Sequence, residues 1–205
     1  MVSRRGTAPP GLRSEGRATR ECGAVKGDGE VGGAPEASED MVSVLALARE
    51  IAESVPDPEL PMLTLADLGI LREVSADGER VIVSLTPTYS GCPALAEMRR
   101  DLSRRLAAAG LVAEVRTVLS PAWSSDWITV AGRRKLAAAG IAPPLPAPPR
   151  GGPVPLALAP VRRDVTCPQC AAPDAEQTAA FSGTACKALY RCAACREPFE
   201  YVKEI

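Results

Sequence analysis

Apolar residues recur every three or four positions in two stretches of the chain, and this spacing predicts two amphipathic helices. The first helix is expected over about residues 43–54, ahead of a proline-rich segment that ends it. The second is expected over residues 94–109 and ends at Gly110, a residue type that commonly follows a helix. The stripes expected to be buried are Val44, Ala48, Ile51 and Val55 in the first helix and Leu95, Met98, Leu102, Leu106 and Ala109 in the second.

Polar and apolar residues alternate in residues 80–85 and 111–119, and this alternation predicts two strands. A further strand is expected ahead of them, over about residues 70–74. Asp77 and Gly78 form a hairpin signal between the first two strands, which should therefore pair antiparallel. The second and third strands flank the second helix, so they should lie parallel, joined by a right-handed crossover. The pattern predicts an α+β fold: a small α-β-β-α-β domain with a mixed sheet.

Composition divides the chain into four segments. Residues 1–40 contain almost no large apolar residues, so we expect a disordered extension there and Met41 as the native initiator. Residues 41–141 form the α/β domain, which closes with a short helix at about 131–139. Residues 142–163 are rich in proline and predict a semi-rigid linker, and residues 164–205 form a separate cysteine-rich module.

Charge and histidine content exclude several classes of protein. The chain of 205 residues carries a formal net charge of -1, which argues against a nucleic-acid-binding protein that neutralises phosphates. It has no histidine, so it cannot form a Ser-His or Cys-His catalytic pair or a histidine-ligated metal centre by itself. No apolar run is long enough to cross a membrane, and no signal-peptide core is evident. We therefore expect a cytoplasmic protein that binds neither membrane nor nucleic acid.

Four of the seven cysteines form two Cys-x-x-Cys pairs separated by 21 residues. This spacing matches a structural zinc site with four thiolates, and strands at about residues 177–181, 187–191 and 199–202 would form the sheet of a zinc ribbon. A module this small rarely folds on its apolar core alone, so the metal should supply folding free energy. A redox dithiol is the alternative interpretation. The predicted ligands are Cys167, Cys170, Cys192 and Cys195.

Cys92 lies between the second predicted strand and the second predicted helix. Unpaired N–H groups and the dipole at a helix start favour the thiolate, the form that binds soft metals or attacks electrophiles. The alternative is a small apolar side chain packed under the sheet. Cys186, beside Lys187, is a further thiol near the ribbon, and the sequence leaves an extra metal ligand, a reactive thiol and simple packing open.

Three acidic residues and two tryptophans are further candidates. Asp57 and Glu59 stand on a stiff proline-rich loop, and Asp67 precedes the first strand. The alternative for these carboxylates is a helix cap or an exposed loop. Trp123 and Trp127 either cover apolar surface of the sheet or form an edge that docks a partner, because tryptophan is enriched at interface hot spots.

Several motifs together resemble the PaaD family of the phenylacetyl-CoA epoxidase system, within the broader metal-sulfur cluster assembly domain family. The resemblance extends from about residue 44 to the last residue. The Asp-Pro-Glu, Asp-Leu-Gly and Gly-Cys-Pro elements indicate the broader family, and the tryptophan segment and the cysteine module narrow it to PaaD. The motifs are residues 56–61 (Pro-Asp-Pro-Glu-Leu-Pro), 67–69, 86–93 (ending in Gly-Cys-Pro), 121–123, 126–127, 183–192 and 195–199.

The resemblance implies an accessory subunit in aerobic phenylacetate degradation, where a separate di-iron protein epoxidises phenylacetyl-CoA and a separate reductase supplies electrons. It also implies a role in maturing an iron or iron-sulfur centre of that system. Such a role implies two kinds of partner: the other epoxidase subunits, and proteins that donate or accept iron-sulfur clusters. The zinc ribbon would then be structural.

Our hypothesis is that Cys92 binds a transferable iron ion or iron-sulfur cluster, held by one chain or bridged between two copies as a homodimer. Asp57, Glu59 and Asp67 would tune or complete this site. The alternative is a non-catalytic adaptor that docks the oxygenase through Trp123 and Trp127. A thiol enzyme with Cys92 as nucleophile is a third interpretation, weakened by the lack of a histidine base. We assign no catalytic residue.

Overall fold

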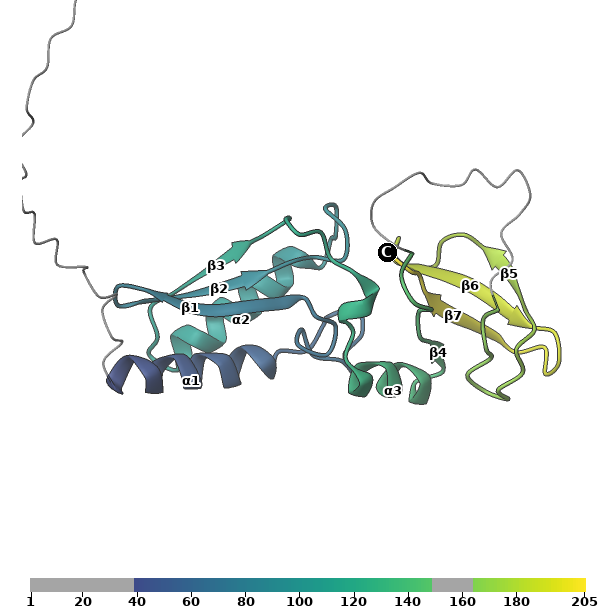
Figure 1. The fold of residues 1–205 in the computed structure, drawn as a ribbon, viewed down its shortest axis with the longest axis horizontal. Coiled ribbons are helices and arrows are strands. Elements are labelled where there is room, and N and C mark those ends of the chain that lie inside the picture. The colour runs from purple at the N-terminus through teal and green to yellow at the C-terminus, as the bar shows by residue number, and fades with distance from the viewer. Residues whose placement is uncertain (1–38, 149–163) are drawn as a thin grey trace, which may run out of the picture. The chain divides into compact units, whose positions relative to one another are not determined.

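The computed structural model of the protein describes residues 39–148 and 164–205. The predicted N-terminal extension up to residue 38, including Cys22, lies outside the described residues. So do residues 149–163, which form most of the predicted linker. The described residues form two sheets, of which the first is flanked by helices (Figure 1).

The first sheet has the strand order β1-β2-β3. β1 and β2 pair antiparallel on either side of the predicted Asp77–Gly78 turn, and β2 and β3 pair in parallel with Val83 opposite Val115. This arrangement confirms the predicted mixed sheet. The strands are Leu71–Asp77 (β1), Arg80–Leu85 (β2) and Ala113–Thr117 (β3).

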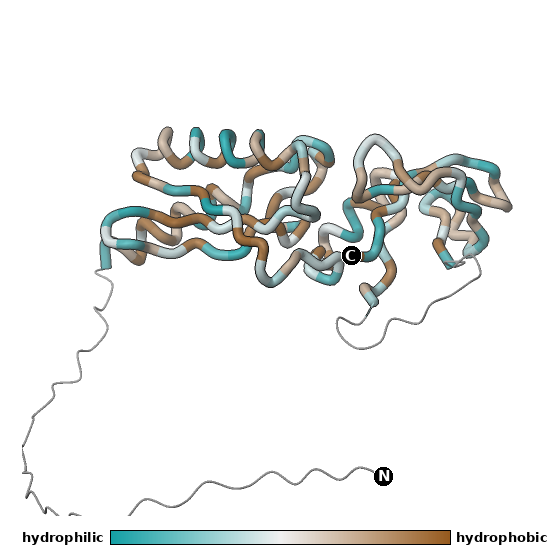
Figure 2. Tube along the Cα trace, turned by 90° about the horizontal axis from the view of Figure 1, so that it is seen from above, coloured by the Kyte–Doolittle hydropathy of each residue, from teal (hydrophilic) through white to brown (hydrophobic). Residues whose placement is uncertain are grey.

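Helices α1 (Glu39–Glu53) and α2 (Leu95–Ala108) contact each other and pack against this sheet (Figure 1). Hydrophobic and hydrophilic residues alternate along the helical turns, as expected for helices with one buried face (Figure 2). The core combines the two helical stripes with the inner face of the sheet. Its fully buried members include Ala48, Ala52, Val81, Val83, Leu85, Met98, Leu102 and Leu106.

Three details of this domain differ from the sequence prediction. α1 begins at Glu39 rather than at residue 43, with two acidic residues in its first turn, where the helix dipole favours negative charge. Ala109 was expected in the buried stripe, but it is the exposed C-cap of α2. The third strand was predicted to reach Leu119, but β3 ends at Thr117, and Leu119 is 58% exposed.

The second sheet has the strand order β4-β7-β6-β5 and forms the ribbon. β6 pairs antiparallel with both β5 and β7, and the short β4 pairs in parallel with β7. Ala142, which the sequence assigned to the linker, is therefore the last residue of a strand in the ribbon sheet. The remaining elements are η1 (Ser125–Trp127), α3 (Val130–Ala138), β4 (Ile141–Ala142), β5 (Ala175–Ala179), β6 (Lys187–Cys192) and β7 (Pro198–Val202).

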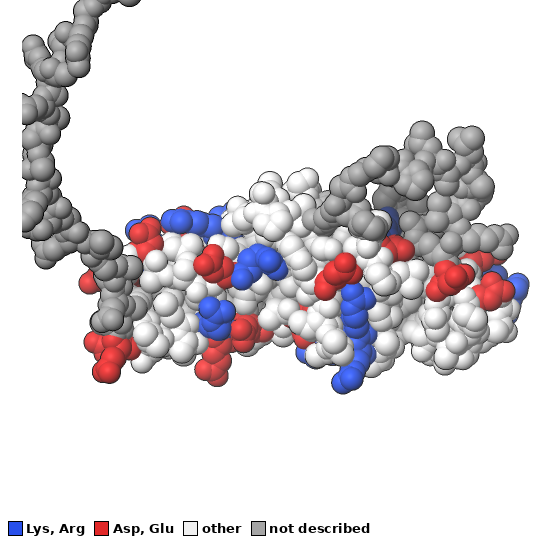
Figure 3. All heavy atoms as spheres, in the orientation of Figure 1, with Lys and Arg blue, Asp and Glu red and all other residues white. Residues whose placement is uncertain are grey.

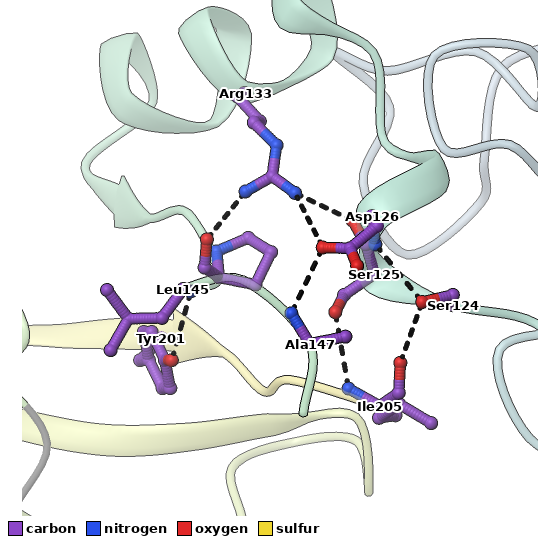
Figure 4. Close-up of polar contacts among 9 residues, drawn as sticks. Ser124, Ser125, Asp126, Arg133, Leu145, Ala147, Tyr201 and Ile205 are labelled. Carbon is purple, nitrogen blue, oxygen red and sulfur yellow. Dashed lines mark hydrogen bonds and ion pairs between the residues drawn. The ribbon is translucent and has the colours of Figure 1, made fainter. Parts of the chain in front are cut away.

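Polar contacts around Ser125, which is fully buried, anchor the ribbon sheet to the first domain (Figure 4). The Ser125 N–H donates to the Ile205 carbonyl at 3.1 Å, and the Ile205 N–H donates to the Ser125 hydroxyl at 3.2 Å. Arg133 of α3 donates to the carbonyl oxygens of Ser125 and Pro144 at 2.8 and 2.6 Å (Figure 4). Val202 at the end of β7 belongs to the apolar core of the first domain. The two sheets are thus joined by buried contacts.

Basic and acidic side chains are interspersed on the face drawn in Figure 3, in keeping with the net charge of -1. The mixture offers no uniformly basic surface on that face for a phosphate backbone. Within residues 39–148 and 164–205, none of the helices combines the length and the apolar character needed to cross a membrane.

Candidate functional site

The four cysteines of the two Cys-x-x-Cys pairs converge, with all four sulfurs within 4.8 Å of one another. Cys167 Sγ lies 3.8 Å from Cys195 Sγ, and Cys170 Sγ lies 3.6 Å from Cys192 Sγ. Around a tetrahedral ion with metal–sulfur bonds of about 2.3 Å, neighbouring sulfurs are about 3.8 Å apart. The spacing and the donor set therefore fit one metal ion held by four thiolates.

The two cysteine pairs have the same backbone geometry. The Ala171 N–H donates to the Cys167 carbonyl at 2.9 Å, and the Arg196 N–H donates to the Cys192 carbonyl at 3.1 Å. Ala171 and Arg196, each directly after the second cysteine of its pair, have positive φ values of 59° and 68°. This left-handed conformation is unfavourable for every residue type except glycine. The tight turn of each cysteine pair therefore lowers the free energy of unfolding of the ribbon when no metal is bound.

Backbone N–H groups also act on the sulfur of Cys192. The N–H groups of Cys195 and Ala194 lower the pKa of the Cys192 thiol to about 6, and the first of them lies 3.5 Å from the sulfur. A thiolate is therefore available there at neutral pH, which suits metal ligation. Cys167 and Cys192 are buried and their pair partners are exposed, so the ligand cluster lies at the surface of the ribbon.

Cys92 lies in the turn between β2 and α2, where the sequence placed it. Its N–H donates to the Tyr89 carbonyl at 3.1 Å, and its own carbonyl accepts the Leu95 N–H at 3.3 Å. The side chain is half-buried and packs against the main core. Cys92 is therefore neither sealed in aliphatic packing nor freely exposed.

Cys92 lines a cavity of about 40 Å³ that receives residues from both sheets. Asp57 and Glu59 of the predicted proline-rich loop line it from the first domain, and Cys186 and Lys187 line it from the ribbon. Its apolar walls include Leu60, Ile70, Met98, Ile128 and Val202. Two thiols and two carboxylates thus share one small and largely apolar space.

Asp57 is buried, with 4% of its surface exposed. Its Oδ1 atom accepts the N–H groups of Glu59 and Leu60, each at 2.8 Å, so the capping role considered from the sequence is present. Among the described residues, Oδ2 accepts no hydrogen bond. Burial raises the pKa of the Asp57 carboxyl, and the nearby Glu59 charge raises it further, against the backbone hydrogen bonds that lower it.

The predicted preference of Cys92 for the thiolate form is wrong. The N–H groups of Ala94 and Leu95 do lower its pKa, as expected near a helix start, but burial has the larger effect and raises it. The charges of Asp57 and Cys186 raise the pKa of Cys92 further. The sequence pattern identified the helix start but not the enclosing walls, and burial by those walls raises the pKa of the thiol.

Tyr89 is a cavity residue that the sequence analysis did not single out, although it stands in the same turn as Cys92. Burial raises the pKa of its phenol, and so do the charges of Cys92, Cys186 and Glu59. Lys187 also faces the cavity but is 7% exposed and pairs with Glu200, at 2.8 Å from Nζ to Oε2. The lysine on the cavity wall is thus already paired.

Asp67 lies away from this cavity. Its carboxylate pairs with Lys135, at 2.6 Å, and accepts the Thr64 N–H at 3.0 Å. Burial favours the neutral acid, but the contacts with Lys135 and Thr64 outweigh it and hold the pKa of Asp67 below its usual value. Among the described residues, Asp57 and Glu59 line the cavity with Cys92, without forming a group of ligand atoms within 4.8 Å, and Asp67 does not line it. The contacts of Asp67 join the segment before β1 to α3.

Trp123 is buried, at 3% exposure, and its indole N–H donates to the Leu68 carbonyl at 2.9 Å. Trp127 is half-buried, with the Arg72 guanidinium 3.6 Å from its ring centroid. These positions match the packing interpretation, and they leave only Trp127 partly accessible to a partner.

Two protein-family models match the chain. The model of an iron-sulfur cluster assembly protein matches residues 49–118, and the model of a PaaD zinc beta ribbon domain matches residues 152–203. A relative in Escherichia coli (strain K12), whose name makes it a component of a 1,2-phenylacetyl-CoA epoxidase, is 41% identical over 154 residues. That alignment covers 75% of this chain and 88% of the relative.

Two solved structures are also similar to the chain. A crystal structure of a domain of unknown function, DUF59, from Bacillus anthracis is 25% identical, covers 46% of this chain and 92% of its own, and has a TM-score of 0.43. A solution structure of a Mycobacterium tuberculosis protein, described as associated with [Fe-S] complex assembly and repair, is 30% identical. It covers 53% of this chain and 96% of its own, with a TM-score of 0.30.

Proposed function

The chain belongs to the PaaD family, and from that premise we propose that it is an accessory subunit of a phenylacetyl-CoA epoxidase system that helps its iron or iron-sulfur centres mature. Its partners would be the other subunits of that system and the proteins that donate or accept iron-sulfur clusters. The oxygenase chemistry itself belongs to another chain, because this sequence contains no histidine for a carboxylate-histidine di-iron centre.

The observation that carries the proposal is the cavity that Cys92, Asp57 and Glu59 line together. A thiolate with carboxylates is a donor set that suits iron and other divalent transition metals. The raised pKa of Cys92 means that a metal must displace a proton to bind at neutral pH. This competition weakens retention, as expected of a site that passes its metal on.

The four-cysteine cluster would hold zinc and act structurally. Bound zinc there supplies folding free energy and no open coordination position, since all four positions are taken by thiolates. The ribbon would retain its metal and contribute Cys186 and Lys187 to the cavity wall, and Cys92 would bind the metal that is transferred.

A cell that produces the epoxidase components with this chain tests the proposal. Replacing the wild type by Cys92→Ser should lower the iron content and the activity of the purified oxygenase several-fold, while the zinc content and the melting temperature of the variant itself stay unchanged. Ser90→Ala, at an exposed position of the same turn, is the matched control.

Full oxygenase activity with Cys92→Ser would overturn the maturation role. If in addition Trp127→Ala abolished co-purification with the oxygenase, the adaptor interpretation would take its place.

A further inference from the structure

We propose that β3 is a docking edge for a second copy of this chain, so that two β3 strands pair antiparallel and extend the mixed sheet across both copies. In this pairing Val115 of one copy lies opposite Val115 of the other. The proposal concerns a different part of the molecule from the Cys92 cavity and does not depend on the proposed function. It rests on the open backbone groups of β3, on its charges and on the exposed apolar residues beside it.

β3 is an edge strand of the first sheet, and the backbone groups of every second residue point away from β2 (Figure 1). The Val81 N–H donates to the Val112 carbonyl at 2.9 Å. The Val118 N–H donates to the Leu85 carbonyl at 2.8 Å, so alternate residues from Val112 to Val118 bond to β2. Because backbone groups of successive strand residues point to opposite sides, the residues between them face outward. The outward-facing residues are Ala113, Val115 and Thr117.

Arg99 of α2 covers one atom of this edge. Its guanidinium donates to the Val115 carbonyl at 3.1 Å, and among the described residues this is the one contact made by the outward-facing backbone groups. A carbonyl oxygen has two lone pairs, so this atom can still pair with a neighbouring strand. β1, at the opposite edge of the sheet, has a register shift between Leu71 and Glu73, whereas β3 pairs with β2 without one. The regular edge is the one that a further strand can join.

The charges of β3 are self-complementary. When Val115 faces Val115 of the other copy, Glu114 of each copy lies opposite Arg116 of the other, and opposite charges at such positions attract. Pairing about Glu114 or about Arg116 would instead place like charges opposite each other, which is unfavourable. Within one chain Glu114 and Arg116 already form an ion pair at 2.8 Å, so two copies would join two such pairs into one network. The charges therefore favour a second copy as the partner strand and fix its register.

Exposed apolar residues flank β3 at both ends. Val112 and Leu119 are both exposed, although each adjoins a strand of the main core. The same pairing brings Val112 of one copy to Val118 of the other. It brings Leu119 to Leu111, which packs against the core of its own copy. A second copy would thus remove both exposed residues from water and add a hydrophobic contribution to the backbone hydrogen bonds.

Analytical ultracentrifugation of the zinc-loaded full chain, under reducing conditions and over about 1–500 µM protein, tests the proposal. We expect a dimer whose fraction rises with concentration. Glu114→Arg and Arg116→Glu should each weaken dimerisation at least about tenfold, because each places like charges opposite each other at both symmetric positions. An equimolar mixture of the two variants should dimerise as tightly as the wild type, since each variant then meets the opposite charges of the other. Glu73→Arg, on the exposed edge strand β1, is the matched control and should not weaken the dimer.

Amide hydrogen exchange locates the interface independently of the charges. The N–H groups of Ala113, Val115 and Thr117 should exchange more slowly at concentrations where the wild type is dimeric than where it is monomeric. In Glu114→Arg they should exchange equally fast at both concentrations. This measurement also shows whether the variant retains slow exchange in β2 and therefore its fold.

Three outcomes would overturn the proposal. They are a wild type that stays monomeric over the whole range, a dimer that both charge variants leave intact, and a mixture of the two variants that fails to recover the dimer. If the outward N–H groups of β3 became protected only on addition of a purified epoxidase subunit, the edge would belong to that partner and not to a second copy. None of these results bears on the maturation role, which the Cys92→Ser experiment tests separately.

Discussion

The ribbon cluster and the Cys92 cavity both bring cysteines together, but they do so by different means. In the cluster, two identical turns place four sulfurs within 4.8 Å of one another through local backbone hydrogen bonds. Cys92 and Cys186 instead line the cavity from turns beside different sheets, and both reach it only because those sheets pack together. A closed set of four thiolates suits a permanent metal, and an open set with carboxylates suits a metal that enters and leaves.

The pKa values of the cysteines also differ between the two sites. Within the cluster, backbone N–H groups lower the pKa of Cys192 to about 6, while at Cys195 the effect of the Glu197 N–H is outweighed by burial and the neighbouring cluster thiols, which raise the pKa. At Cys92, burial raises the pKa. The comparison teaches that a cysteine's place in a motif does not set its reactivity. Hydrogen bonds to the sulfur and enclosure by apolar walls act in opposite directions, and their balance differs at each site.

The largest effect is expected from breaking the cluster. Cys192→Ser, or removal of the metal with a chelator, should unfold the ribbon, because structural zinc sites carry roughly 10–16 kcal/mol of apparent binding free energy at pH 7. The apolar cluster of the ribbon is small and centres on Tyr190, Phe199 and Tyr201, so it should not compensate. Zinc analysis and amide hydrogen exchange would follow the loss.

The matched control for this prediction is Cys186→Ser, which lies in the same ribbon but outside the cluster. It should retain zinc and slow exchange in β6 and β7. A ribbon that stays protected from exchange without metal would contradict the assignment of a structural role to the cluster.

Replacing either of the two buried aspartates by asparagine should change the free energy of unfolding moderately, and the two changes should have opposite signs. Asp67→Asn should lower the free energy of unfolding at pH 7 by about 1 kcal/mol, because it breaks the pair with Lys135. Asp57→Asn should raise it, because the amide oxygen keeps both backbone hydrogen bonds and the buried charge is gone. Urea unfolding of each variant beside the wild type measures both changes.

The pH dependence gives a second measurement of the same pair. The folded pKa of Asp67 is lowered, so its contribution is present above its unfolded pKa and is lost as pH falls below about 4. The pKa of Asp57 is raised in the folded state, so ionisation of this carboxyl destabilises the fold. The destabilisation is absent in acid and appears as pH rises through the raised pKa. Equal effects of both variants at every pH would refute the distinction between a structural carboxylate and a cavity carboxylate.

The smallest effect concerns the turns that follow the cysteine pairs. Ala171→Gly should stabilise the metal-bound ribbon by up to about 1 kcal/mol, because glycine adopts the positive φ of 59° without the penalty of a side chain. Ala172→Gly, one position later and without a positive φ, should destabilise it instead. Chelator-dependent melting of the two variants measures the difference. A lower melting temperature for Ala171→Gly would refute the claim that the tight turn is strained.

The sequence by itself determined the elements and the cysteine cluster. The periodicity of residues 94–109, the Asp77–Gly78 turn and the two Cys-x-x-Cys pairs are local signals, and each depends on neighbours within a few positions along the chain. The resemblance carried by the Gly-Cys-Pro turn and the ribbon motif likewise pointed to the family that the relative then established. Element ends were less accurate, as at Glu39 and Leu119, because packing and capping decide where a helix or strand stops.

Only the tertiary structure decided which of the candidate residues meet. Asp57 and Asp67 are both acidic residues on loops of the same domain, yet one lines the Cys92 cavity and the other pairs with Lys135 of α3. Cys186 lines the same cavity as Cys92 because Val202 packs into the first domain's core and Ile205 binds Ser125. Such contacts join residues far apart along the chain, so the spacing of residues in the sequence does not predict them. The burial that follows from the same packing also raises the pKa of Cys92, which no local pattern encodes.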